Sequence, residues 1–301
     1  MLAHCLKSLS QLADPRPSHD IEVIVVDNNS NDDTSNLVRG LISDFPFELR
    51  YVFEGIQGIS AARNRAVEEA KGHYIAFLDD ECVVDPDWLS IAISDIEEFH
   101  PPFIGGPYFG AFLPGPRPKW FKIEYGDAWF LKYSPQRGFH HLLPAPGGNM
   151  LVRRDVFEEV RFDIAMGSIA NSYNVGEETY LQEQFLQAHD SERVFYEPAL
   201  VVRHFILPPK MQLSYSAKRS FLDALRKDQK SVTLKRFVIA LIKVLILSTI
   251  SPIRCILRNR KKYPYWQNDA YERALPRTSF HAGTVVKYVR DRWARIRALK
   301  T

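Results

Sequence analysis

Three consecutive carboxylates, Asp79, Asp80 and Glu81, directly follow an apolar run, Tyr74 to Leu78, that predicts a buried strand. Carboxylates this close repel one another unless a cation lies among them, and oxygen ligands suit Mg²⁺ or Mn²⁺ carrying substrate phosphates. In an open α/β sheet, ligands bind at the carboxyl ends of the strands, where these acids fall. The pattern therefore predicts a metal-assisted site for a phosphate-bearing substrate. The structural alternative is a solvated turn.

Acids at two other places fit the same site. Asp27 ends the apolar run that starts at Ile21, and can accept hydrogen bonds from a nucleobase or cap the helix that follows. Glu177 and Glu178 stand at the start of an amphipathic helix. Their position suits the helix macrodipole, but adjacent carboxylates also raise each other's pKa, as a general base requires.

Strand-like and helix-like segments alternate along the first 110 residues. Strands that alternate with helices of ten or more residues predict an α/β fold with a mainly parallel, Rossmann-like sheet and flanking helices. The expected strands are 21–27, 48–54, 74–78, 147–152, 194–196 and 199–204, and the expected helices include 2–12, 59–70, 88–99 and 154–160. Between Phe103 and Pro146 the pattern breaks down, which is typical of a functional loop or lid. Its aromatic residues form an acceptor platform or part of the core.

Charge divides the chain. Residues 1–205 carry 17 Lys and Arg against 31 Asp and Glu, whereas residues 206–301 carry 22 against 5, giving net charges of −14 and +17. We therefore expect a catalytic domain over 1–205 and a helical, basic region over 206–301.

The three cysteines are far apart and odd in number, which disfavours a disulfide framework and indicates a reducing compartment. The helix at 2–12 does not resemble a signal peptide.

The basic region contains an apolar run, Phe237 to Ile250, interrupted by Lys243 and bounded by cations. It is shorter than the roughly 20 apolar residues of a spanning helix, so we expect an interfacial helix on anionic lipid. The alternatives are a tilted span and a helix packed on the catalytic domain. A second basic helix is expected over 288–300. These features predict a peripheral or monotopic protein at the cytoplasmic face of the inner membrane.

Six motifs occur in one order over residues 1–205, and with them the chain resembles the inverting glycosyltransferases of family 2, which have the GT-A fold. The motifs are 24–34 (IVVDNNSNDDT), 58–64 (GISAARN), 75–81 (IAFLDDE) with 86–89 (PDWL), 147–150 (GGNM), 176–178 (GEE) and 201–204 (VVRH). The family opens with an apolar strand before the helix that here begins at Leu2, so we expect either that the start codon is misplaced or that the first strand of the fold, with part of the base pocket, is missing. Glu81 and Glu178 stand where the family more often has Asp.

The resemblance implies a nucleotide sugar, most simply a UDP-sugar, as the donor and a glycan or lipid-linked acceptor in surface-polysaccharide or glycolipid assembly. It implies a divalent cation, Mn²⁺ or Mg²⁺, that bridges the two phosphates. Glu81 is implied to bind this cation, with His204 as a further ligand or a structural histidine. Glu178 is implied to be the catalytic base, with Glu177 beside it, because an inverting transfer by this hexosyltransferase class needs one carboxylate to deprotonate the acceptor hydroxyl.

The remaining implied contacts are with the nucleotide sugar. Arg63 lies in a helix that begins near Gly58, and both the guanidinium group and the helix N-terminus suit an anionic diphosphate. The alternative is a surface arginine paired to Glu68 or Glu69. The glycines before Asn149 let the backbone approach the sugar, or form a tight turn into a strand. The full set implied to bind the nucleotide sugar is Asp27, Asn29, Arg63, Asp79, Asp80, Gly148 and Asn149.

Other classes of protein remain as alternatives. A catalytically inactive, membrane-bound scaffold of the same fold is one, because of the missing strand and the two Glu substitutions. A nucleic-acid-binding protein would use the basic region, but the acidic first part and the lack of a reading motif count against nucleic acid as a partner. A nucleotidyltransferase shares the metal chemistry but needs a Gly-rich or basic phosphate loop, which we do not find.

Overall fold

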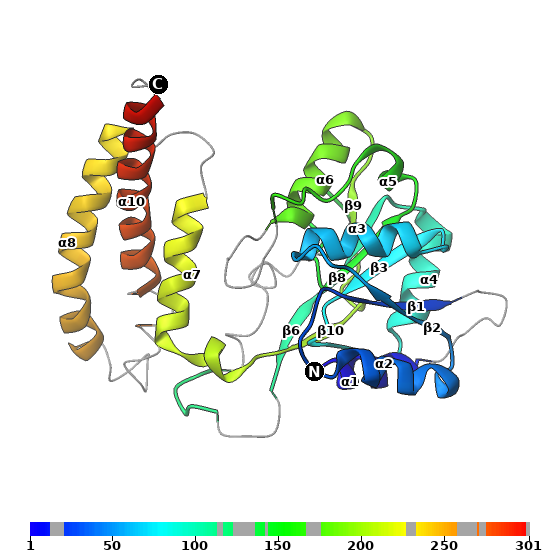
Figure 1. Ribbon diagram of the computed structural model, residues 1–301. Coiled ribbons are helices and arrows are strands. Elements are labelled where there is room, and N and C mark those ends of the chain that lie inside the picture. The colour runs from blue at the N-terminus through cyan, green and yellow to red at the C-terminus, as the bar shows by residue number, and fades with distance from the viewer. Residues whose placement is uncertain are drawn as a thin grey trace. The chain divides into compact units, whose positions relative to one another are not determined.

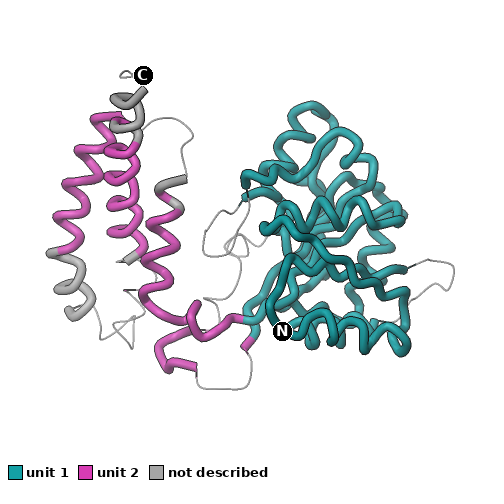
Figure 2. Tube along the Cα trace, viewed as in Figure 1, with its two compact units in different colours: residues 1–111, 126–205 teal, residues 112–125, 206–301 magenta. Residues whose placement is uncertain are grey.

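The computed structural model describes residues 1–12, 21–112, 117–122, 136–141, 144–166, 176–226, 233–257, 270 and 275–298. The chain forms two compact units (Figure 2): unit 1 contains residues 1–111 and 126–205, and unit 2 contains residues 112–125 and 206–301. The division after residue 205 falls where the net charge changes sign. The segment 112–125 belongs to unit 2, although it interrupts unit 1 in the sequence.

Unit 1 is an α/β unit whose described strands form three sheets (Figure 1). The strands are β1 (Glu22–Asp27), β2 (Glu48–Phe53), β3 (Tyr74–Leu78), β4 (Cys82–Val84), β5 (Phe103–Gly105), β6 (Tyr108–Ala111), β7 (Gly138–His140), β8 (Asn149–Arg153), β9 (Val194–Tyr196) and β10 (Val202–Phe205). The sheet orders are β1-β2, β4-β10-β6 and β3-β8-β5-β9-β7.

The expectation of a mainly parallel sheet is wrong in detail, because the pairing is mixed. β1–β2, β5–β9 and β6–β10 are parallel, whereas β8 runs antiparallel to both β3 and β5. β8 follows β7 in the sequence, lies between β3 and β5 and runs opposite to both, and antiparallel neighbours need no crossover connection. Among the described strands, β1 and β3 each have a single partner and do not pair with each other.

Unit 1 has six described α-helices. They are α1 (Leu2–Ser10), α2 (Thr34–Leu41), α3 (Ile59–Glu69), α4 (Trp88–Phe99), α5 (Val156–Glu159) and α6 (Glu177–Ala188). Of these, α3, α5 and α6 cover one face of the five-stranded sheet and α4 the other. Met150 and Val152 of β8 join one core with α3, α5 and α6, whereas Leu151 joins another with α4. β8 therefore reads as a continuous apolar run, because both of its faces are buried.

The segment 103–146 contains more regular structure than its sequence suggests. β5, β6 and β7 lie within it, and Phe121 is buried against Ile206 and Met211 in unit 2. Phe121 is therefore a core residue rather than part of an acceptor platform. Four of the aromatics considered for that platform, Tyr125, Trp129, Phe130 and Tyr133, lie outside the described residues.

Unit 2 contains three helices: α7 (Leu213–Arg226), α8 (Leu234–Leu257) and α10 (Leu275–Ala298). α10 packs against both α7 and α8 (Figure 1). Gly283 permits the close approach of α10 to α7, because a Cβ there would lie 2.4 Å from the Phe221 carbonyl oxygen. The predicted apolar helix 237–250 is part of the longer α8, and the predicted helix 288–300 is part of α10. None of the described helices combines the length and apolarity needed to cross a bilayer.

Candidate active site

Residues from separate elements of unit 1 form one continuous series of contacts. It runs from Glu81 through His204, Tyr108, Asp79 and Arg63 to Glu177. These residues come from the β3–β4 turn, β10, β6, α3 and α6. The series therefore brings the predicted metal ligands, a predicted nucleotide-binding acid and the predicted catalytic helix into one site.

Sheet pairing brings Glu81 and His204 together. β10 lies between β4 and β6, and His204 is in register with Cys82, the residue after Glu81. The Phe205 amide donates to the Glu81 carbonyl oxygen at 2.8 Å, and His204 Nε2 lies 2.6 Å from Glu81 Oε1. His204 is buried and Glu81 is half-buried. One carboxylate and one imidazole therefore converge at a position partly open to a ligand.

These two ligands do not form a complete protein cage. No three His, Cys, Asp or Glu side chains within the described ranges gather closely enough to hold a metal ion by themselves. A site for Mg²⁺ or Mn²⁺ that also binds substrate phosphates needs only one or two protein carboxylates, because phosphates and water supply the other ligands. Glu81 and His204 fit such a shared site.

Tyr108 connects the metal side of the site to Asp79. Its ring centroid lies 4.9 Å from that of His204, and its hydroxyl donates to Asp79 Oδ2 at 3.0 Å. Burial, followed by the negative charge of Asp79, raises the pKa of Tyr108 far above its usual range. Tyr108 is therefore a neutral donor that fixes the orientation of the Asp79 carboxylate.

Arg63 connects Asp79 to α6, the helix of the predicted base. The side chain is buried, with Nη2 3.5 Å from Asp79 Oδ1 and Nη1 2.7 Å from Glu177 Oε1. Nη2 also donates to the Gly147 carbonyl oxygen at 3.1 Å. The alternative of a surface arginine paired to Glu68 or Glu69 is wrong for Arg63. Those two carboxylates pair with Arg65 instead.

Glu177 and Glu178 have different environments although they are adjacent. Gly176 adopts φ = 104°, a left-handed conformation that favours glycine, and α6 begins directly after it. Glu177 is 5% exposed and Oε1 pairs with Arg63, while Oε2 is buried without a hydrogen-bond partner. Burial, and then the charge of Glu177, raise the pKa of Glu178 to about 7. Glu178 is therefore poised to accept a proton near neutral pH.

The two glycines before β8 form a turn whose Cα atoms lie against site side chains. A Cβ on Gly147 would lie 2.6 Å from Arg63 Nη2, and a Cβ on Gly148 would lie 2.6 Å from both Asp79 Oδ2 and Tyr108 Oη. The glycines therefore give Arg63 and Asp79 the space to reach each other.

Asn149 requires a correction, because its amide is not available to a sugar. Its exposed fraction is 0%. Its Oδ1 accepts from Trp88 Nε1 at 3.0 Å, and its Nδ2 donates to the carbonyl oxygens of Leu200 at 2.7 Å and Pro107 at 3.3 Å. Asn149 therefore joins β8 to α4 and to the loops before β6 and β10, and it acts on the site only through the backbone it positions.

Asp27 ends β1 and is buried in a local hydrogen-bond network. Oδ1 accepts from the Ser30 amide at 2.9 Å and Oδ2 from the Tyr51 hydroxyl at 2.7 Å, so Asp27 stabilises its own turn and does not cap α2. Burial raises its pKa, but the bonds from Ser30 and Tyr51 outweigh this and hold the pKa of Asp27 below its usual value. An ionised acceptor at this strand end suits a base N–H.

The residues after Asp27 form the turn that positions α3. Asn28 donates from Nδ2 to the Ile56 carbonyl oxygen at 2.6 Å and accepts from the Gly58 amide at 2.6 Å. Asn29 is exposed and has φ = 59°, so its side chain lies on the open side of the turn. Asp80 is also exposed. Although the residue as a whole is exposed, the protein packed near its carboxyl group, followed by the charges of Glu81 and Asp79, raises the pKa of Asp80.

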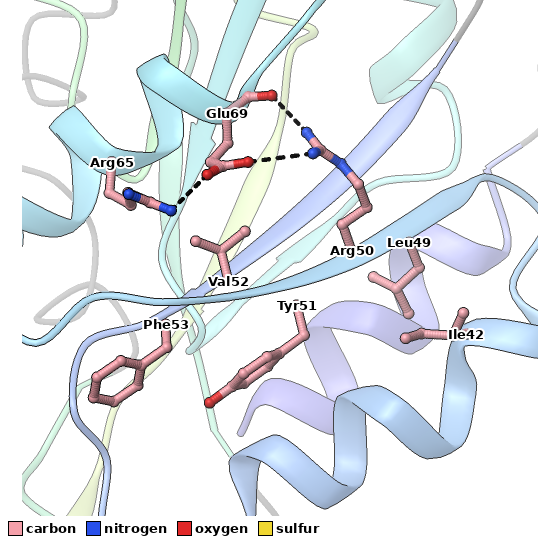
Figure 3. Close-up of a pocket in the computed structure, with 8 residues that line it drawn as sticks. All are labelled: Ile42, Leu49, Arg50, Tyr51, Val52, Phe53, Arg65 and Glu69. Atoms are coloured by element: carbon pink, nitrogen blue, oxygen red, sulfur yellow. Dashed lines mark hydrogen bonds and ion pairs between the residues drawn. The ribbon is translucent and has the colours of Figure 1, made fainter.

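A cavity of about 600 Å³ lies at the free edge of β2 and differs from the predicted site (Figure 3). Its guanidinium groups do not form a phosphate site, because each already pairs with carboxylates: Arg50 with Glu22 and Glu69, and Arg65 with Glu68 and Glu69. Tyr51, whose hydroxyl contacts Asp27, and Phe53, which is in register with Asp27, link this cavity to the predicted residues.

Several site residues were not assigned roles from the sequence. Tyr108 was noted only as one aromatic residue among many. Gln182 of α6 accepts from the Ala145 amide at 2.8 Å and donates to the Ala145 carbonyl oxygen at 3.0 Å, so it fixes the backbone before the two glycines. No local pattern marks these residues, because their partners are far away in the sequence. The sequence does mark Asn28, because it directly follows a strand end inside the motif 24–34.

Comparison with known proteins decides the family. The family model described as Glycosyl transferase family 2 matches residues 1–161, more than half of the chain. The chain belongs to glycosyltransferase family 2. The enzyme is therefore a glycosyltransferase, as its motifs predicted.

Among the curated relatives of this glycosyltransferase is the succinoglycan biosynthesis protein ExoM of Rhizobium meliloti. It is 29% identical over 232 residues, which are 73% of this chain and 68% of ExoM. The glycosyltransferase AglE of Haloferax volcanii is 31% identical over 156 residues, which are 52% of this chain and 49% of AglE. The chain thus spans about two thirds of the first relative and half of the second.

Solved structures confirm the GT-A glycosyltransferase fold. The mannosyltransferase PcManGT of Pyrobaculum calidifontis, in complex with GDP-Man and Mn²⁺, gives a TM-score of 0.62 at 16% identity and covers 96% of this chain and 83% of its own. S. aureus TarS 1-349 in complex with UDP gives 0.51 at 16% identity, with coverage of 97% and 88%. At these identities the likeness concerns the fold alone.

Proposed function

We propose that this glycosyltransferase moves a sugar from a nucleotide sugar to a glycan or lipid-linked acceptor by a single displacement that inverts the anomeric centre. The observation that carries the proposal is the series of contacts from Glu81 to Glu177. The series joins the proposed metal ligands, Glu81 and His204, to Asp79, the proposed nucleoside contact. It then reaches α6, whose Glu178 has a raised pKa. These are the groups that a metal-assisted glycosyl transfer needs.

Glu178 is the proposed base. A carboxyl group with a pKa near 7 is ionised in part of the molecules at neutral pH, and it is basic enough to accept the proton of an attacking hydroxyl. Glu177 Oε1 pairs with Arg63 at 2.7 Å, and Glu177 lies beside Glu178. The charge of Glu177 is, after burial, the second cause of the raised pKa of Glu178, so Glu177 raises the basicity of the proposed base.

Glu81 and His204 are the proposed protein ligands of a divalent cation, Mn²⁺ or Mg²⁺. When bound with the donor, the cation would neutralise the charge of the departing diphosphate. Asp27, the exposed Asn29 and Asp79 would contact the nucleoside, and Arg63, released from part of its ion pairing, would lie near the phosphates.

The donor is proposed to be a UDP-sugar, following the family resemblance. TarS was solved with UDP and PcManGT with GDP-Man and Mn²⁺, so both nucleotides belong in the test. ExoM is named for succinoglycan biosynthesis, and a 25% identical relative from Haloferax volcanii is named glucosyl-dolichyl phosphate glucuronosyltransferase. These names support a role in surface-polysaccharide or glycolipid assembly.

A thermal-shift titration with UDP, GDP, CDP and dTDP, each with and without Mn²⁺, tests donor binding. We expect Mn²⁺-dependent stabilisation by one nucleotide, lost in Glu81→Ala and retained in Asp85→Ala, whose carboxylate pairs with the exposed Arg203. Stabilisation by none of the nucleotides would contradict the proposed site.

Turnover separates the base from the binding residues. Glu178→Gln should keep nucleotide binding and lose transfer, whereas Glu183→Gln, an exposed position on the same helix, should keep both. Full transfer by Glu178→Gln would assign the base elsewhere. If the unaltered chain bound a nucleotide but transferred sugar to no acceptor, the result would favour the inactive-scaffold alternative.

A further inference from the structure

Helix α8 is apolar on nearly all sides. Its inner side packs on α10, where Phe237 stacks on Tyr288 with ring centroids 4.4 Å apart and Ala240 is buried. Its outer side bears seven large apolar residues that are between 39% and 63% exposed: Leu234, Val238, Ile239, Leu241, Ile242, Leu245 and Ile246. At 3.6 residues per turn these seven side chains cover an arc of about 160°.

An apolar arc of this size is unusual on a helix that faces water. An ordinary surface helix has one apolar face, turned toward the core, and polar residues on the other. On α8 the face turned away from α10 is also largely apolar. Contiguous exposed apolar surface of this kind marks a protein or membrane contact.

The charges around the arc favour one kind of partner. α8 contains no Asp or Glu between Leu234 and Leu257. Arg236 and Lys243, seven residues apart, lie on one side of the helix along a border of the arc, and the exposed Lys235 lies within the arc at the first turn of α8. Residues 206–301 carry 22 Lys and Arg against 5 Asp and Glu. A second copy would bring the same positive charge to the contact, whereas an anionic surface is attracted to it.

We propose that the outer face of α8 inserts into the headgroup boundary of an anionic lipid bilayer, with the helix axis in the membrane plane. Apolar side chains enter the acyl region, and the bordering cations extend to the lipid phosphates. A helix in the interface needs neither the length nor the apolarity of a membrane-spanning helix. The proposal concerns unit 2 alone and does not depend on the transferase reaction.

Vesicle flotation with the full chain tests the proposal. The probes are phosphatidylcholine vesicles with and without about one third phosphatidylglycerol, at low and high NaCl. We expect binding to the anionic vesicles and about tenfold weaker binding by Leu245→Gln, which removes an apolar contact without changing the charge. Ile164→Gln in unit 1 is the matched control, because Ile164 is 61% and Leu245 60% exposed. We expect the control to bind as the unaltered chain does.

Several outcomes would overturn the proposal. Absence of binding to anionic vesicles would do so. Binding that is unchanged in Leu245→Gln but abolished by NaCl would also do so, because the contact would then be electrostatic only. A concentration-dependent dimer, seen by light scattering and lost in Leu245→Gln, would assign the face to a second copy. Nucleotide thermal shifts of Leu245→Gln should match those of the unaltered chain, so failure of the lipid proposal is distinguishable from failure of the transferase proposal.

Discussion

Arg63 and Glu177 form a buried ion pair across the site, with Nη1 and Oε1 2.7 Å apart and the two residues 114 positions apart in the sequence. The pair joins α3 to the first turn of α6. Because Arg63 also reaches Asp79, the orientation of this acid, the proposed nucleoside contact, and that of α6, which carries the proposed base, depend on one guanidinium group.

Removing the guanidinium should destabilise unit 1. Arg63→Met leaves the Glu177 carboxylate buried and unpaired, a change that costs roughly 3–5 kcal/mol at buried sites. Urea unfolding followed by circular dichroism would measure the loss. Arg65→Met on the same helix is the control, and its more exposed ion pair predicts a change of at most about 1 kcal/mol. Equal losses in the two variants would show that the buried pair has no special role.

Activity should rise with pH through the range near 7. Burial and the charge of Glu177 raise the pKa of Glu178 to about 7, and only the deprotonated carboxylate can act as the base. The rate is therefore low below this pKa and reaches a plateau above it. A pH profile of kcat with saturating donor and acceptor would measure the midpoint.

Glu177→Gln should move that midpoint to lower pH. The substitution removes the negative charge that raises the pKa of Glu178, while burial remains. The same pH profile of kcat would measure the shift, with Glu183→Gln as a control of equal charge change on an exposed side of α6. An unmoved midpoint in Glu177→Gln would mean that another group titrates in the profile.

Substitution of Asn149 should lower stability with little effect on donor affinity. Asn149→Ala leaves the Trp88 N–H and the Leu200 carbonyl oxygen without partners at a fully buried position, at a cost of about 1–3 kcal/mol for each unsatisfied group. Chemical unfolding and nucleotide titration of the folded protein would measure the two quantities. Asn36→Ala, on the exposed side of α2, is the control. A large loss of donor affinity at unchanged stability would restore Asn149 as a sugar ligand.

A methyl group at position 148 should disrupt the site. In Gly148→Ala the new Cβ would lie 2.6 Å from Asp79 Oδ2 and Tyr108 Oη, so Asp79 and Tyr108 must move. We expect lower stability and weaker nucleotide binding, measured by thermal shift. In Gly40→Ala the new Cβ meets nothing within 4 Å, and this helical position should gain about 0.5–1 kcal/mol. Unchanged nucleotide binding by Gly148→Ala would show that the glycine turn is not part of the site.

The sequence by itself determined most local elements and the family of this protein. The apolar run before Asp79 predicted β3, and Glu177 and Glu178 marked the start of α6. These features were readable because they depend on neighbours in the chain: strand burial, helix starts and turn residues act over a few positions. The change of net charge after residue 205 likewise follows from composition.

Only the tertiary structure decided which residues meet. Arg63 and Arg65 lie on one helix in similar local sequence, yet Arg63 is buried against Glu177 and Arg65 pairs on the surface with Glu69. Asn149 became a fully buried connector, and Tyr108 a donor to Asp79, because β8 and β6 return to the site from segments far along the chain. Such contacts depend on strand order, direction and register, which arise from the packing of the whole unit and leave no mark in the local sequence.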